Sequence, residues 1–414
     1  MGFRYENNEL YVENIKVEEI VNKEKTPLYI YSKSYFKKQF EKFDKAFSRK
    51  HCVSFAIKAN SNLSVINTFA KLGSGADIVS KGELFRAIKA GVDTSKIVFS
   101  GVAKTKDEIE YALKNNIMMI NVESMDELYS INEVAKNLGV KARISFRVNP
   151  NVDPKTHPYI STGLKKNKFG IPYDEAYDSY IKAKNLKNID VYGVQFHIGS
   201  QLLDSKPIYD ASVKIAELMK KLEEEGIEWR AVDVGGGLGI VYDNRKDTPP
   251  SVEIYAEQIE KAFEGFPDVL LVFEPGRFMV GNGGILVTEV VYHKTNSNKN
   301  FIIVDAGMND LLRPSLYGAY HEIKPLKIED KKKIVCDIVG PICETGDFLA
   351  RDYEIENVEN GGYLSVFSAG AYGFTMSSNY NSRVRPAEIM VDNDTYKVIR
   401  EREELDNLIK GEKI

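Results

Sequence analysis

Apolar runs and amphipathic stretches alternate along the first two thirds of the chain. Short runs rich in β-branched and aromatic residues indicate buried strands, and the longer stretches between them have the spacing of amphipathic helices. The strand candidates are Val53–Lys58, Ala76–Ser80, Ile97–Gly101, Met118–Val122, Ala142–Asn149, Val191–His197, Ala231–Gly235 and Val269–Glu274. The helical stretches include Lys81–Ala90, Lys106–Lys114, Ser124–Leu138 and Lys206–Glu225. Eight strands within about 250 residues, each but the last followed by a helical stretch, predict a (β/α)₈ barrel of the TIM type. A doubly wound open sheet gives a similar alternation and is the alternative.

The pattern changes after about residue 280, where strand-like runs follow one another without long helices. These runs are Gly284–His293, Phe301–Ala306, Lys333–Val339, Gly362–Phe367, Glu388–Val391 and Thr395–Ile399. They predict a second, mostly antiparallel β-domain, which Tyr29–Tyr31 can join. We therefore expect the barrel over residues 31–279 and the β-domain over residues 1–30 and 280–414.

Composition narrows the classes of function. The 414 residues are 43% hydrophobic and 28% charged, with a formal net charge of −4, so there is no electrostatic case for nucleic-acid binding. No apolar run approaches the roughly 20 residues of a membrane helix, and the polar N-terminus lacks a signal-peptide core. We expect a cytoplasmic protein. The three cysteines and five histidines show no metal-ligand spacing, so we predict no metal site.

Candidate chemistry lies where the predicted strands end, the edge at which barrels keep their active sites. Lys58 closes the apolar run Val53–Lys58. A lysine at this position can pair with an acid, or it can be the amine that reacts with a carbonyl group. The alternative is that its aliphatic side chain is buried while its ammonium group reaches water. Asp77, His197 and Glu274 lie in or at the ends of three other predicted strands. Each has a structural alternative: His197 as a satisfied core histidine, and Glu274 as the partner of an internal arginine.

The glycine triplet Gly235–Gly237 follows the seventh predicted strand. Consecutive glycines allow backbone N–H groups to surround a phosphate, and barrels bind phosphate after strands seven and eight. A tight turn is the alternative. The triplet is not a dinucleotide fingerprint, because Ile240 occupies the third glycine position, and no Gly-Lys-Ser/Thr follows it. An amine, a phosphate cradle, a carboxylate and a flat imidazole around one barrel mouth together indicate pyridoxal 5′-phosphate.

Six runs of the chain resemble one enzyme family over nearly the whole length. They are Phe55–Asn60, Gln195–Ser200, Asp233–Gly237, Glu274–Arg277, Cys343–Asp347 and Gly370–Gly373. The family is diaminopimelate decarboxylase, one of the fold-type III pyridoxal-phosphate decarboxylases. The segment 157–163, followed by Lys168–Gly170, also resembles this branch. The resemblance implies an alanine-racemase-like fold and a carboxy-lyase that converts meso-2,6-diaminopimelate to L-lysine and CO₂, the last step of lysine biosynthesis. Another fold-type III decarboxylase, such as the carboxynorspermidine or ornithine type, is the alternative.

The resemblance also assigns roles to residues. Lys58 is expected to bind the cofactor aldehyde, and Lys58, His197 and Cys343 are the expected catalytic residues, with Cys343 returning a proton to the α-carbon. The cofactor-binding set is Lys58, Asp77, His197, Ser200, Gly235, Gly236, Gly237, Glu274, Gly276, Arg277 and Tyr372. The substrate-binding set is Arg277, Arg313, Tyr317, Glu344 and Tyr372. Arginine suits a distal carboxylate, because its guanidinium is always charged and binds in a bidentate manner. The loop with Cys343 and Glu344 is expected to reach the neighbouring subunit's site, which implies a homodimer with shared active sites.

Overall fold

The computed structural model describes residues 2–153 and 168–414, which form two compact units. The barrel unit comprises Gln39–Ile240 and Thr248–Met279, and the β-unit comprises residues 1–38, Val241–Asp247 and Val280–Ile414. Helix α2 (Lys33–Asp44) and helix α10 (Arg277–Val280) each cross a boundary along the chain. The predicted segment 157–163 lies outside the described residues.

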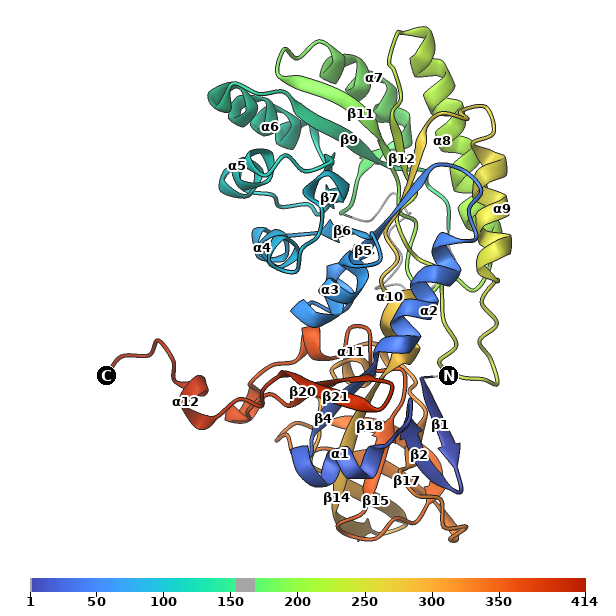
Figure 1. The fold of residues 1–414 in the computed structure, drawn as a ribbon, viewed down its shortest axis with the longest axis vertical. Helices are drawn as coiled ribbons and strands as arrows, with labels where there is room; N and C mark the ends of the chain where they lie inside the picture. The colour runs from blue at the N-terminus through green and yellow to red at the C-terminus, as the bar shows by residue number, and fades with distance from the viewer. Residues whose placement is uncertain (1, 154–167) are drawn as a thin grey trace. The chain divides into compact units, whose positions relative to one another are not determined.

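A closed parallel barrel forms the centre of the barrel unit (Figure 1). Its eight strands are β5 (His51–Ala56), β6 (Gly75–Ile78), β7 (Ile97–Phe99), β8 (Met119–Val122), β9 (Ala142–Asn149), β11 (Ile189–Gln195), β12 (Ala231–Asp233) and β13 (Leu270–Phe273). The sheet closes because β8 pairs with β9 and β13 pairs with β5. The short strand β10 (Ile171–Pro172) pairs with β9. Closure confirms the predicted barrel over the open sheet.

Helices lie around the outside of these strands (Figure 1). They are α3 (Leu63–Ala70), α4 (Lys81–Lys89), α5 (Lys106–Lys114), α6 (Met125–Leu138), α7 (Tyr173–Lys184), α8 (Lys206–Glu224) and α9 (Val252–Ala262). Local chemistry sets where several of them begin. Ser80, Thr105 and Ser124 each precede a helix and accept a hydrogen bond from a backbone N–H of its first turn. The strands are buried on both faces, which is why they read as continuous apolar runs.

Several predicted strands extend too far toward their carboxyl ends. The first predicted strand ran to Lys58, whereas β5 ends at Ala56 and Lys58 lies in the 3₁₀ turn Ile57–Ala59. The chain stops pairing where it leaves the barrel, although its apolar character continues into the turn. Lys58 is therefore in a connecting turn at the carboxyl edge of the strands.

The β-unit contains a second large sheet with mostly antiparallel pairings. Its strands are β4 (Leu28–Ser32), β14 (Gly284–Asn296), β15 (Lys299–Val304), β16 (Ile323–Pro325), β17 (Lys333–Val339), β18 (Phe348–Glu356), β19 (Tyr363–Val366), β20 (Ala387–Asp392) and β21 (Thr395–Arg400). Only the pairs β15–β17 and β4–β20 are parallel among the described residues. This confirms the predicted β-domain and places the apolar run around Tyr29–Tyr31 in it as β4.

Smaller elements complete the β-unit. A three-stranded sheet consists of β1 (Phe3–Glu6), β2 (Glu9–Val12) and β3 (Ile15–Lys16), and the helices are α1 (Val17–Glu24), α11 (Arg313–Tyr317) and α12 (Leu405–Leu408). The core packs α1 against β4, β14 and β20. Strand β18 is absent from the sequence prediction because exposed Arg351 and Asp352 interrupt its apolar alternation, and Asp352 has a positive φ of 47°.

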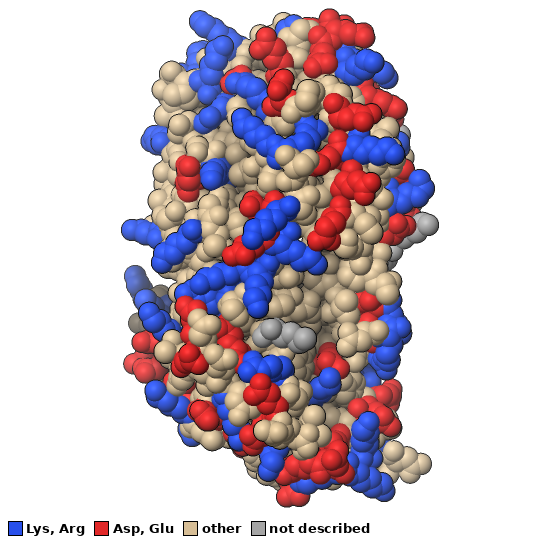
Figure 2. Space-filling model, turned by 45° about the vertical axis from the view of Figure 1, so that its right-hand side comes forward, with Lys and Arg blue, Asp and Glu red and all other residues tan. Residues whose placement is uncertain are grey.

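Both charge signs occur over the surface. On the face drawn in Figure 2, lysine and arginine side chains lie among aspartate and glutamate side chains. Within residues 2–153 and 168–414, every helix is too short or too polar to cross a membrane.

Candidate active site

Lys58 and Asp77 meet at the carboxyl edge of the barrel. Ala56 of β5 lies opposite Asp77 of β6, and the turn after β5 carries Lys58 back over that position. Lys58 Nζ donates a hydrogen bond to Asp77 Oδ2. The lysine side chain is 40% exposed, whereas that of Asp77 is fully buried. The amine is thus both paired and accessible, which a carbonyl-capturing lysine requires.

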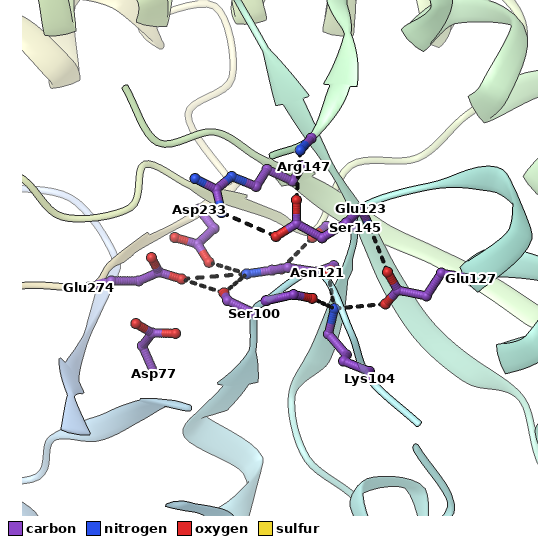
Figure 3. Close-up of polar contacts among 12 residues, drawn as sticks. Asp77, Ser100, Lys104, Asn121, Glu123, Glu127, Ser145, Arg147, Asp233 and Glu274 are labelled. Atoms are coloured by element: carbon purple, nitrogen blue, oxygen red, sulfur yellow. Dashed lines mark hydrogen bonds and ion pairs between the residues drawn. The ribbon is translucent and has the colours of Figure 1, made fainter. Parts of the chain in front are cut away.

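A buried polar network fills the carboxyl end of the barrel (Figure 3), and Asn121 of β8 is its centre. Asn121 Nδ2 donates to Ser100 Oγ and to Asp233 Oδ2, both at 3.0 Å, and lies 3.4 Å from Glu274 Oε1. Ser100 Oγ donates to Glu274 Oε1 at 3.2 Å, and Ser145 Oγ donates to Asn121 Oδ1 at 2.5 Å. One amide therefore joins side chains from five barrel segments.

Two carboxyl groups in this network hold a proton more tightly than usual. Burial, followed by the negative charges of Asp233 and Asp77, raises the pKa of Glu274 well above its ordinary value. Burial also raises the pKa of Asp233 to about 6. A cation next to Glu274 would favour its ionised form, as a protonated ring nitrogen would.

The triplet Gly235, Gly236 and Gly237 has no room for side chains. A Cβ on Gly235 would lie 2.8 Å from His197 Nδ1, and one on Gly236 would lie 2.3 Å from the Glu274 carbonyl oxygen. Gly237 has a φ of +119°, which side-chain-bearing residues rarely adopt. The loop is therefore a bare backbone surface beside His197 and Glu274, as a phosphate-binding loop must be.

His197 is neutral in this environment. Burial, followed by the positive charges of Arg147 and Lys58, lowers the pKa of His197 well below its ordinary value. The backbone N–H of Gly236 donates to His197 Nδ1 at 3.3 Å, so that nitrogen is the acceptor. The imidazole is thus held beside the glycine triplet by the backbone itself.

Arg277 and Ser200 lie beside each other at the same edge. Arg277 begins α10, and its guanidinium donates to Ser200 Oγ at 2.9 Å. Gly276 precedes it, and a Cβ there would lie 2.9 Å from the Cβ of Ala59, next to Lys58. The Glu274–Arg277 run therefore meets the turn that carries Lys58.

The residues at the barrel mouth fit pyridoxal 5′-phosphate. Asp77 Oδ1 is buried and has no hydrogen-bond donor among the described residues, so the Lys58 side of the site has unused acceptor capacity. The glycine triplet supplies backbone surface for a phosphate, and Glu274 is a buried acid in need of a cation. An accessible amine completes the set of groups that this cofactor needs.

The remaining predicted residues lie in the β-unit. Arg313 and Tyr317 are the first and last residues of α11, and Tyr372 has a positive φ of 56° within Gly370–Gly373. Cys343 and Glu344 are exposed. The backbone N–H of Cys343 donates to Asn381 Oδ1 at 2.7 Å.

Asp347 and Ser315 anchor the Cys343 loop. Buried Asp347 accepts hydrogen bonds from the backbone N–H groups of Met308 at 2.6 Å and Ile342 at 2.7 Å. Ser315 of α11 donates to the Gly346 carbonyl oxygen at 2.6 Å. The loop with the candidate proton donor and the helix with Arg313 are therefore held together in one unit.

Sequence reasoning missed several polar residues at the barrel mouth. Asn121 lies inside an apolar strand, and a polar residue in such a run is itself a signal of a buried network. Glu83 follows β6 on α4, and burial raises its pKa to about 7, with Lys58 acting in the opposite direction. Arg147 and Glu123 form a buried ion pair at 3.1 Å (Figure 3). Nothing in the spacing of that pair predicts their contact.

Comparison with known families identifies related proteins. Residues 33–281 match the family described as pyridoxal-dependent decarboxylase, pyridoxal binding domain. The diaminopimelate decarboxylase of Vibrio cholerae is 50% identical over 408 residues, covering 98% of this chain and 97% of that protein. That of Aquifex aeolicus is 48% identical over 406 residues, covering 98% and 96%.

Solved structures give the same relationship. The diaminopimelate decarboxylase of Helicobacter pylori complexed with L-lysine superposes with a TM-score of 0.92 at 47% identity, covering 95% of this chain and 98% of that one. The diaminopimelate decarboxylase of M. jannaschii in complex with L-lysine superposes with a TM-score of 0.94 at 39% identity, covering 100% and 98%.

Proposed function

Because the chain belongs to the pyridoxal-dependent decarboxylases, and within them to the diaminopimelate decarboxylase family, we propose that it converts meso-2,6-diaminopimelate to L-lysine and CO₂. The observation that carries the proposal is the accessible amine of Lys58 on a buried carboxylate, at the same barrel edge as a glycine triplet and the buried carboxyl group of Glu274. This would be the last step of lysine biosynthesis.

The barrel residues hold the cofactor in this proposal. Lys58 binds the aldehyde, Gly235–Gly237 with Ser200 and Gly276 bind the phosphate, and Glu274 pairs with the ring nitrogen. His197, which is neutral because burial lowers its pKa, would contact the cofactor ring. Asp77 holds the Lys58 amine in place through its hydrogen bond. When bound, the cofactor supplies an electron sink for the electron pair that remains when the carboxylate leaves.

The β-unit supplies the proposed substrate contacts other than Arg277, which belongs to the barrel unit. Arg313 and Tyr317 bind the carboxylate at the end of the substrate that does not react, together with Arg277, Glu344 and Tyr372. Diaminopimelate has a carboxylate at that end, whereas ornithine has only a cationic amine. A guanidinium therefore favours the first substrate by attraction and disfavours the second by like-charge repulsion.

Cys343 is the proposed acid. Its Sγ gives a proton to the α-carbon after CO₂ has left, and the exposure of Cys343 leaves the thiol accessible for that transfer. An exposed loop that carries a proposed catalytic residue is suited to reach the active site of a neighbouring subunit. We propose a homodimer in the cytoplasm, in which Cys343 and Glu344 of one subunit complete the site of the other.

The direct experiment supplies the purified protein with pyridoxal 5′-phosphate and meso-2,6-diaminopimelate. We expect stoichiometric CO₂ and L-lysine, and little CO₂ from ornithine. Turnover of ornithine at a comparable kcat/KM would reject the assigned substrate. Turnover of neither substrate would reject the activity.

Mixing two inactive variants tests the shared site. Lys58→Ala and Cys343→Ala subunits, recombined in equal amounts, should recover about a quarter of wild-type activity, because half of the dimers are mixed and each of these has one intact site. Absence of recovery, with mixed dimers confirmed by mass spectrometry, would show that each subunit uses its own Cys343.

A further inference from the structure

Arg313 and His321 lie side by side because of the way α11 ends. Pro314 occupies the first turn of the helix, and Gly318 ends it in the left-handed conformation with a φ of 61°. The Gly318 N–H donates to the Pro314 carbonyl oxygen at 3.0 Å. This turn reverses the chain, so that His321 returns to Arg313 eight residues later.

His321 is almost completely buried, at 1% exposure, and each of its ring nitrogens has a partner. Nδ1 lies 2.7 Å from the Phe367 carbonyl oxygen, and Nε2 lies 2.8 Å from a terminal nitrogen of Arg313. A carbonyl oxygen can only accept a hydrogen bond, and a guanidinium can only donate one. The partners therefore assign a neutral imidazole with its proton on Nδ1 and its lone pair on Nε2.

The backbone around His321 is held by a strand ladder. Ile323 of β16 pairs with Val366 of β19, and the Phe367 N–H donates to the Glu322 carbonyl oxygen at 2.8 Å. The Phe367 carbonyl oxygen, which accepts the hydrogen bond from His321, is therefore next to a paired segment. Its fixed position fixes the imidazole, and the imidazole lone pair then points at Arg313.

Tyr242 covers the same guanidinium with its ring. The Arg313 guanidinium carbon is 4.6 Å from the centre of the Tyr242 ring, and the rings of Tyr242 and His321 meet edge to face at 5.4 Å. Neither an imidazole lone pair nor an aromatic face cancels a positive charge. These two contacts orient the guanidinium, and neither of them neutralises the positive charge that a carboxylate would bind.

We propose that His321 is a positioning residue that orients Arg313 for the distal carboxylate of the substrate. The proposal rests on the proposed function, since it assigns to Arg313 the carboxylate that does not react. His321 itself does not touch the substrate. Replacing His321 should therefore change the affinity for molecules that carry this carboxylate.

Two amide substitutions separate the two hydrogen bonds of His321. In His321→Asn, the side-chain amide replaces Nδ1 and can still donate to the Phe367 carbonyl oxygen, but nothing reaches Arg313. In His321→Gln, the longer amide places an acceptor oxygen near the Nε2 position and can still accept from Arg313. Both variants remove the ring and each keeps one of the two hydrogen bonds, so their comparison shows which of the two bonds substrate affinity depends on.

We expect His321→Asn to raise the KM for diaminopimelate and the inhibition constant of L-lysine by about 10- to 100-fold, as for a hydrogen bond to a charged group. His321→Gln should change both by less than about threefold. The kcat and the dissociation constant of pyridoxal 5′-phosphate, followed by absorbance, should stay within about twofold in both variants. A role in folding alone would not produce this pattern.

Three results would overturn the proposal. The first is a normal KM in His321→Asn, and the second is a larger defect in His321→Gln than in His321→Asn. The third, measured on the wild-type protein and therefore independent of how the variants fold, is a nitrogen NMR spectrum in which the His321 proton is on Nε2. Failure of the proposed function would differ from all three, because the wild-type protein itself would then release no CO₂.

Discussion

The barrel unit and the β-unit place opposite charges at their functional residues. The barrel gathers the carboxyl groups of Asp233 and Glu274 around the Asn121 amide, and burial, followed by the negative charges of Asp233 and Asp77, raises the pKa of Glu274. The β-unit holds Arg313 against a neutral imidazole and an aromatic face. The first arrangement favours cations, such as an amine or a protonated ring nitrogen, and the second favours a carboxylate. A substrate with an amino-acid group at each end needs both.

The largest effect should come from the barrel amine. Lys58→Ala should lower kcat by at least about 10⁴-fold, because the nucleophilic amine is lost. CO₂ release measures the effect, and mass spectrometry after borohydride reduction should find the cofactor on Lys58 in the wild-type protein alone. Lys58→Arg is the matched control, since it keeps a cation beside Asp77 and should be similarly inactive. Activity above a tenth of wild type in either variant would contradict the assignment.

A smaller effect should come from the β-unit cation. Arg313→Ala should raise the KM for diaminopimelate by about 100-fold with a lesser change in kcat, because the attraction to the distal carboxylate is lost. Arg351→Ala removes an exposed arginine of the same unit and should leave the KM unchanged. Equal KM values for the two variants would place the distal carboxylate elsewhere.

The two units also differ in how well the sequence predicts them. All eight barrel strands were predictable, because parallel strands buried on both faces read as apolar runs, although a run such as Val53–Lys58 does not show where pairing stops. In the β-unit, β18 was missed because Arg351 and Asp352 break its alternation. Apolar pattern reports burial, and it therefore locates central strands better than edge strands.

The functional residues of the two units also differ in how well the sequence predicts them. Lys58 and the glycine triplet are visible because each is unusual at the end of an apolar run. Arg313 was predicted through family resemblance alone, since a single arginine in the mixed apolar and polar run Leu311–Tyr317 has no distinguishing context. His321 gave no signal, because its role depends on a contact with Arg313 and on a carbonyl oxygen 46 residues away. Such contacts exist only after folding.

Buried acids of the two units should titrate differently. Asp310 of the β-unit is buried, and burial raises its pKa to about 7. A carboxyl group with a raised folded-state pKa stabilises the fold fully below its unfolded pKa, near 4, and loses that contribution as pH rises to about 7. The cofactor-free wild-type protein should therefore lose stability between pH 4 and 7. In Asp310→Asn, this loss should be smaller by about 2–3 kcal/mol.

Urea unfolding at a series of pH values measures this effect. The exposed Asp330→Asn in the same unit is the control and should keep the wild-type pH dependence. Asp233 and Glu274 should still cause their own loss of stability with rising pH in both variants, because they lie in the barrel unit. An unchanged slope in Asp310→Asn would show that Asp310 ionises freely in the folded protein.

The amide at the centre of the carboxyl network is the next test of the comparison. Asn121→Ala should cost about 1–2 kcal/mol of unfolding free energy, because buried acceptors on Asp233 and Glu274 lose a donor. It should weaken cofactor binding while leaving the inhibition constant of L-lysine for loaded enzyme nearly unchanged. Asn185→Ala, on an exposed surface of the same unit, should cost under about 0.5 kcal/mol. If Asn121→Ala instead weakened the binding of L-lysine and left cofactor binding unchanged, the roles given to the two units would be reversed.

The aromatic face over Arg313 should give the smallest effect. An exposed or half-buried cation–π contact contributes about 0.5–1 kcal/mol, so Tyr242→Leu should raise the KM for diaminopimelate by about two- to fivefold. Tyr242→Phe keeps the ring over the guanidinium and should retain the wild-type KM, which makes it the matched control. A wild-type KM in both the Leu and the Phe variant would leave His321 alone to orient the guanidinium. A rise in the KM for both would instead assign the Tyr242 hydroxyl group, rather than its ring, to the site.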